Sequence, residues 1–153
     1  MTMTDIAKLS DYVTFSVAGQ MFGVPIERVQ DVFKPTRITR VPLAGSEIAG
    51  VLNLRGRIVT AVELRIRLGL GVREGGNGPM AIGIESQGES FGLLVDAVGE
   101  VLKLAEGERE ANPVNLDRHL GRVSAGVYRL DGELLVILDI DRVLDPGGQA
   151  VAA

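Results

Sequence analysis

The chain repeats itself once, and this repeat limits the folds that are open to it. The run FGVPIERVQDV at residues 22–32 aligns without gaps on FGLLVDAVGEV at residues 91–101, an offset of 69 residues from 22 to 91. GVLNLRGRIV at residues 50–59 then matches GVYRLDGELL at residues 126–135, an offset of 76 residues from 50 to 126. Two blocks in the same order, with glycines in register, predict a duplicated unit rather than a chance similarity of apolar strands.

Within each half, short apolar runs alternate with tight-turn signals. Val13, Phe15 and Val17 fall on one face of a strand, and the segment that follows contains Gly19. Asp131-Gly132 lies between two apolar runs, which is a strong short-range signal for a β-hairpin. The sequence predicts four hairpins, at residues 12–24, 51–62, 80–95 and 127–138.

Strands at this spacing predict an all-β fold of two small β-barrels with short connecting helices. The helical pieces are expected at residues 64–68, 105–110 and 140–144. The glycine-rich stretch 69–79 is the best candidate for a linker. The predicted domain therefore covers 12–145, and the tails 1–11 and 146–153 are expected to be flexible. The first barrel is placed at about 12–69 and the second at about 80–145, with strand exchange between them left open.

Composition narrows the possible environments and partners. The 153 residues include 16 Lys and Arg against 20 Asp and Glu, so the net charge of -4 argues against binding to nucleic acid or to anionic membranes. No Cys is present, which excludes disulfides and thiolate chemistry. The first ten residues lack the apolar core of a signal peptide, and no apolar run is long enough to span a bilayer. We expect a cytoplasmic protein that does not insert into the membrane.

Residues for catalysis or metal binding are scarce. His119 is the single histidine, so a catalytic triad or a zinc site has little to be built from. Asp139, Asp141 and Asp145 lack the glycine and the terminal glutamate of a calcium loop, and helix capping by Asp139 or Asp141 is the better interpretation. The sequence therefore predicts no enzyme, no metal and no cofactor.

The two matched hairpin tips differ in a way that points to a working surface. Asp131-Gly132 satisfies the preference for positive φ at both central residues, whereas Arg55-Gly56 places a long cation at such a position. A local preference that is overridden often marks function. The alternative is a different turn type that accepts Arg without cost, and the sequence alone does not separate the two.

The run from Gly50 to Val59, with Glu63-Leu64-Arg65 after it, resembles the signature of the CheW family of chemotaxis coupling proteins. So do FGVPI at 22–26 with VQDV at 29–32, and FGLLVD at 91–96 with VGEV at 98–101. The similarity extends from about residue 12 to residue 144, nearly the whole chain. It implies two five-stranded barrels and a non-catalytic adaptor that joins chemoreceptor cytoplasmic tips to the regulatory domain of the histidine kinase CheA. The adaptor is then recruited from the cytoplasm to receptor arrays.

The resemblance also implies which residues make contact with the partners. The Arg and Gly of the family's Asn-Leu-Arg-Gly motif correspond to Arg55 and Gly56. The acidic residue that follows the family's Val-Gln pair corresponds to Asp31, which follows Gln30. Glu is the family's usual residue at the position of Asp31, so an ion pair between Asp31 and Arg55 is expected to be altered or bridged by water. These four residues are the predicted surface for coupling to kinase and receptor.

An apolar groove between the barrels is the implied receptor site, and it would take a helix. It maps to Val29, Val98 and Val101, with Met80 as a further member. The alternative for each of these residues is ordinary barrel core. Two other functions stay open: a coupling protein of the same fold in a related chemosensory pathway, such as surface motility, and a β-barrel nucleic-acid module, which the acidic composition disfavours.

Overall fold

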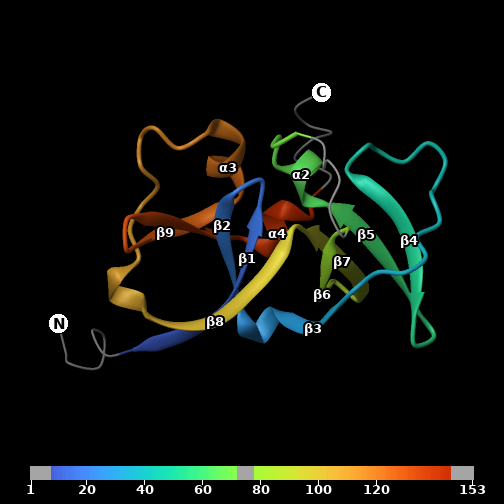
Figure 1. Ribbon diagram of the computed structural model, residues 1–153, viewed down its shortest axis with the longest axis horizontal. Helices are drawn as coiled ribbons and strands as arrows, with labels where there is room; N and C mark the ends of the chain where they lie inside the picture. Colours follow the sequence, from blue (N-terminus) through green and yellow to red (C-terminus); the bar gives the residue numbers. More distant parts are fainter. Residues whose placement is uncertain (1–7, 72–77, 146–153) are drawn as a thin grey trace.

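A computed structural model describes residues 8–71 and 78–145, and this part of the chain is mainly β (Figure 1). The strands form two five-stranded sheets. Sheet A contains, in spatial order, β8 (Ala97–Ala105), β1 (Leu9–Val17), β2 (Gln20–Pro25), β10 (Glu133–Leu138) and β9 (Ser124–Leu130). Sheet B contains β3 (Val29–Phe33), β6 (Met80–Ser86), β7 (Glu89–Val95), β5 (Arg57–Glu63) and β4 (Ile48–Leu54). The prediction of an all-β fold with two five-stranded units is confirmed.

Each sheet combines the first two strands of one half with the last three strands of the other. Under the repeat, β1, β2 and β3 correspond to β6, β7 and β8, so the two sheets have the same strand order. The halves meet at two parallel pairs, β2 with β10 and β7 with β5, and at two antiparallel pairs, β1 with β8 and β3 with β6; the pairs within each half are antiparallel. The strands of 12–69 and of 80–145 are therefore distributed over both sheets, which is the exchange that the sequence left open.

Segments outside the ladders lie across the sheet edges. Among the described residues the two ladders stay open, and Thr39 and Glu110 form matching bridges to Val51 and Val127. At each bridge, the backbone of the bridging segment lies directly against a glycine of the repeat. Gly126 has φ +132°, and a Cβ there would come within 3.0 Å of the carbonyl oxygen of Glu110; in sheet B, Gly50 meets Thr39 in the same way. The glycines in register thus mark a close backbone approach that occurs twice.

The main hydrophobic core lies between the two sheets. It contains Phe15 and Phe22 from sheet A, whose rings stack with centroids 5.7 Å apart, and Ile82 and Leu93 from sheet B. Two smaller clusters lie on the other faces of the sheets, one around Tyr128 and one made of smaller aliphatic side chains. Because one core joins both sheets, the two halves of the chain pack as one body.

Helices in the described residues are short. Glu63 and Asp139 cap the corresponding helices α2 (Leu64–Arg67) and α4 (Ile140–Val143), so the capping role predicted for Asp139 is confirmed, while Asp141 lies in the first turn. The helix predicted at 105–110 is a single 3-10 turn, η2 (Glu106–Glu108), and η1 (Ile26–Arg28) is another. Helix α3 (Arg118–Val123) was not predicted. Of the predicted tails and linker, residues 1–7, 72–77 and 146–153 lie outside the described residues, whereas residues 9–11 of the predicted N-terminal tail belong to β1.

Candidate functional site

The hairpin between β4 and β5 places Arg55 at its tip. Arg55 has φ +53° and Gly56 has φ +85°, so the tip has positive φ at both central residues. The side chain of Asn53 supports the turn by accepting a hydrogen bond from the backbone N of Gly56 at 2.9 Å. The alternative of a turn type that accepts Arg without cost is therefore wrong.

The other hairpin tips qualify the argument from strain. Ala18, Gln87 and Asp131 also have positive φ, and each precedes a glycine with positive φ. Ala and Gln are no better suited to this conformation than Arg is. A disfavoured residue at a tip therefore does not by itself single out Arg55. What distinguishes Arg55 is its partner.

That partner is Asp31 in β3. Arg55 Nη1 lies 3.6 Å from Asp31 Oδ2, a direct ion pair although Asp is one methylene shorter than Glu. The Arg55 side chain is 79% exposed and the Asp31 side chain 21%. The second carboxylate oxygen of Asp31 is buried and has no hydrogen-bond partner among the described residues. It lies over Gly83, the residue paired with Asp31 in β6, where a Cβ would clash with it. Glycine at position 83 thus gives this carboxylate its place.

A second contact runs beside the ion pair. Arg57 Nη1 donates to Gln30 Oε1 at 3.4 Å, and Gln30 Nε2 donates to Glu85 Oε1 at 3.2 Å. The register of β3 and β6 shifts between Val29 and Asp31, so Gln30 lies at a bulge. Since β3 and β4 are the opposite edges of sheet B, the hairpin tip connects one edge to the other through side chains. We call Gln30, Asp31, Arg55, Gly56 and Arg57 the polar surface.

The same position in sheet A has no such arrangement. The equivalents of Arg55, Arg57 and Asp31 are Asp131, Glu133 and Glu100. All three are acidic, so they cannot form an ion pair with one another. The polar surface belongs to one copy of the repeat only.

Apolar side chains on the edge strands β3 and β8 form the second predicted group. Val29, Val98 and Met80 are half-buried and pack against the main core, whereas Val101 is 50% exposed. Val32 is 40% exposed and was missed, although the repeat aligns Val29 with Val98 and Val32 with Val101. That alignment was the signal that could have found it. β3 and β8 lie along the lower side of the molecule in Figure 1.

Other candidate chemistry stays weak in the structure. The carboxylate of Asp117 caps α3, and the backbone N–H of His119 lowers the pKa of that carboxyl group by donating to it. His119 Nδ1 lies 3.4 Å from Asp117 Oδ1 on an exposed turn. Among residues 8–71 and 78–145, no group of His, Asp and Glu is placed to hold a metal ion. No helix in these ranges has the length and apolarity needed to cross a bilayer.

Comparison with known proteins decides the family. A CheW-like domain matches residues 11–146, which is most of the chain. The chain belongs to the CheW family. The chemotaxis protein CheW of Thermotoga maritima is 29% identical over 144 residues, covering 94% of this chain and 93% of that protein. CheW of Bacillus subtilis is 29% identical over 133 residues, covering 87% and 85%.

The fold agrees with a solved CheW structure. The scaffolding protein TtCheW from Thermoanaerobacter tengcongensis superposes with a TM-score of 0.81 at 30% identity, covering 92% of this chain and 96% of that one. The chemotaxis protein CheA of Salmonella typhimurium is 28% identical over 134 residues, which are 85% of this chain and 19% of CheA. A CheW-like fold thus recurs as part of a much longer chemotaxis protein. The chain is a chemotaxis protein of the adaptor and scaffold class.

Proposed function

We propose that this CheW-family chain couples chemoreceptor cytoplasmic tips to a CheA-type histidine kinase without catalysing a reaction. The polar surface, with the Asp31–Arg55 ion pair at its centre, is proposed to contact the kinase regulatory domain. The observation that carries this assignment is that the ion pair exists in one copy of the repeat and has only acids at the equivalent place in the other. Folding requires the residues that both copies of the repeat share. A contact with one partner requires its residues on one copy only.

The receptor side of the proposal uses the apolar side chains on β3 and β8. Val101 and Val32 expose a large part of their surface, while Val29, Val98 and Met80 support them from the edge of the main core. These exposed valines, at equivalent positions on two edge strands, are proposed as the apolar contacts for an amphipathic helix, and we call them with Val29, Val98 and Met80 the exposed strip. A modest interface with few anchor side chains is expected for such a contact.

The test is a reconstituted mixture of a chemoreceptor fragment, a CheA-type kinase and this protein. Arg55→Ala is expected to weaken kinase binding roughly tenfold, because an Arg at the centre of an interface is a frequent anchor. The matched control is Arg129→Ala, since Arg129 pairs with Glu110 at 3.1 Å on sheet A and is 63% exposed. The midpoint of thermal unfolding is measured for both variants, so that loss of folding is recognised.

A second variant assigns the receptor side in the same mixture. Val101→Asp places a charge on the exposed strip and is expected to reduce receptor binding while kinase binding is kept. If Arg55→Ala leaves kinase binding and kinase control at the level of Arg129→Ala, the polar surface is not the kinase contact. Equal loss of both partners in Val101→Asp would reject the separation of the two surfaces.

A further inference from the structure

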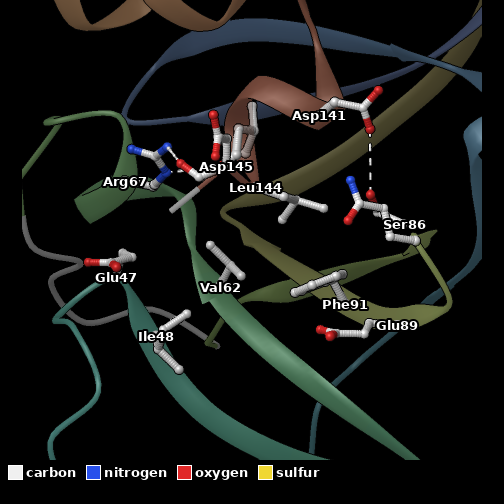
Figure 2. Close-up of a pocket in the computed structure, with 12 residues that line it drawn as sticks. Glu47, Ile48, Val62, Arg67, Ser86, Glu89, Phe91, Asp141, Leu144 and Asp145 are labelled. Carbon is white, nitrogen blue, oxygen red and sulfur yellow. Dashed lines mark hydrogen bonds between the residues drawn. The ribbon is translucent and has the colours of Figure 1, made fainter. Parts of the chain in front are cut away.

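A cleft of about 570 Å³ lies between α4 and sheet B, at the margin of the main core (Figure 2). Apolar side chains gather at its centre: Ile48, Val62, Phe91 and Leu144. Its rim carries four carboxylates, which belong to Glu47, Glu89, Asp141 and Asp145, and the guanidinium of Arg67; Arg28, which does not line the cleft, pairs with Asp141 at 3.2 Å. None of the residues proposed above for the kinase or the receptor lines this cleft, so it is a separate feature of the molecule.

The corresponding positions in the other copy of the repeat show what can occupy this cleft. The cleft residues Ser86, Phe91 and Leu144 correspond to Val17, Phe22 and Leu68. The first three are half-buried, whereas each of the second three is 0% exposed. Val17, Phe22 and Leu68 belong to the same core cluster as Leu120 and Val123, the apolar residues of α3. A Cβ at Gly69, the neighbour of Leu68, would come within 3.3 Å of the ring of His119 in α3. Beside sheet A, helix α3 therefore lies at the surface that corresponds to the open cleft of sheet B.

Backbone hydrogen bonds confirm that the two places are equivalent. The backbone N of Asp139 donates to the carbonyl of Val123 at 2.7 Å, and that of Glu63 donates to the carbonyl of Glu47 at 2.7 Å. Val123 therefore corresponds to Glu47, and α3 corresponds to residues 42–47. These residues form no helix, and Leu43 is 104% exposed. Of this segment only Glu47 lines the cleft, so no apolar side chain of residues 42–47 closes it.

The helix α3 beside sheet A and the charges around the cleft together indicate what kind of segment can bind in the cleft. α3 presents Leu120 and Val123, three residues apart, and also carries Arg118 and Arg122. Positively charged side chains beside two apolar anchors complement a rim of four carboxylates around an apolar floor. The wall of the cleft is fixed, because Arg67 Nε donates to the carbonyl of Val143 at 2.7 Å and so ties α2 to α4.

We propose that the cleft is a docking site for a short basic amphipathic helix of a protein partner. Two apolar side chains at positions i and i+3 of that helix pack on Ile48, Phe91 and Leu144. Its basic side chains lie along the rim, near Glu89 and Asp145. Beside sheet B, the partner helix occupies the position that corresponds to that of α3 beside sheet A.

The probe is an alanine-based helical peptide that carries Arg, Leu, Arg and Val at the spacing of residues 118, 120, 122 and 123. It is titrated into the full-length, ¹⁵N-labelled protein, and we expect the amide signals of Ile48, Val62, Phe91 and Leu144 to shift. A second peptide with Ser in place of the Leu and Val keeps the charge and should not bind. Shifts of equal size with both peptides, or none at millimolar peptide, would overturn the proposal.

Charge variants test the rim. Glu89→Lys combined with Asp145→Lys is expected to weaken peptide binding roughly fivefold, since exposed charge pairs contribute modestly. The control is Glu133→Lys, because Glu133 begins β10 after a hairpin tip as Glu89 begins β7, but lies outside the cleft. An equal effect of the control would show that net charge alone is responsible, and the docking site would be rejected.

Two other occupants give distinct outcomes. If deletion of residues 146–153 shifts the same four amide signals without peptide and strengthens peptide binding, the chain's own end fills the cleft. If those signals depend on protein concentration, a second copy fills it. Either result would replace the proposed partner helix, and neither would affect the test of Arg55.

Discussion

Sheets A and B have the same strand order, the same glycine at the bridge and the same capped helix after the last strand. Gly50 and Gly126 allow the close backbone approach, and Glu63 and Asp139 cap the helices that follow. These residues hold the backbone in both copies. The copies differ in side chains that face solvent or fill a cluster, so the duplication fixes the frame and leaves other positions to specialise.

Three differences separate the sheets. Sheet B has the ion pair of Arg55 with Asp31, where sheet A has acids. Sheet A buries Tyr12 against Tyr128, where sheet B has Ala81 and Leu52. Helix α3 lies at one apolar surface, and the equivalent surface beside sheet B is the open cleft. The first and third differences expose groups that a partner can bind, whereas the second is confined to the interior.

The largest expected effect is a difference between Phe22 and Phe91, which occupy equivalent positions in the repeat. Phe22 is fully buried and stacks on Phe15, so Phe22→Ala should lower the free energy of unfolding by about 4 kcal/mol. Phe91 faces the cleft and is half-buried, so Phe91→Ala should cost roughly half as much. Urea unfolding of both variants measures the difference. Equal losses would mean that Phe91 is as well covered as Phe22 and that the cleft is closed in solution.

This asymmetry between the halves lies largely beyond sequence reasoning. Turn residues and alternating strands predicted all four hairpins, because both signals are local. The pairing of β2 with β10 and of β7 with β5 was left open, since local periodicity does not say which strand is the neighbour. Helix α3 was missed because it is short, contains Gly121 and shows only Leu120 and Val123 as apolar positions.

The candidate site was predicted in part for similar reasons. Asp31 and Arg55 came from the family resemblance, and the structure brings them together at 3.6 Å. The argument from turn strain at Arg55 was incomplete, because Ala18 and Gln87 adopt the same conformation. The cleft needed three-dimensional information, since its residues come from α2, from the β6–β7 hairpin and from β4, β5 and α4 with their flanking residues. The offset between the matching blocks grows from 69 to 76 residues, so the sequence shows seven extra residues in the second half. It does not show that a helix, α3, forms in the same region.

The tyrosine pair of sheet A should make stability depend on pH above about 10. Burial, with the hydroxyl of Tyr12 3.5 Å away, raises the pKa of Tyr128. The unfolded chain releases the tyrosine proton near its ordinary pKa of about 10 while folded Tyr128 stays neutral, so the folded state is destabilised as the pH rises. The free energy of unfolding should then fall by up to about 1.4 kcal/mol per pH unit from this group.

Tyr128→Phe isolates that contribution. The variant should lose the part of the decline that Tyr128 causes, and near neutral pH it should differ from the parent protein by less than about 1 kcal/mol, since the hydroxyl contact is long. Urea unfolding at about pH 8.5 and at about pH 11 provides the comparison. Sheet B has Leu52 at the equivalent position, and a leucine side chain does not ionise. An unchanged decline in the variant would show that Tyr128 ionises in the folded protein as easily as in the unfolded one.

The smallest expected effect separates turn strain from the ion pair at the hairpin tips. Gln87→Asn places a residue that tolerates positive φ at a strained position, and should stabilise the protein by roughly 0.5 kcal/mol. Arg55→Asn relieves the same strain but removes the contact with Asp31, which is worth about 0–1 kcal/mol at such exposure, so little net change is expected. The difference between the two variants measures the ion pair, and it should shrink in about 1 M salt because exposed charges are screened. If Arg55→Asn stabilises the protein as much as Gln87→Asn does, the ion pair adds nothing to folding, and any role of Arg55 must lie in binding a partner.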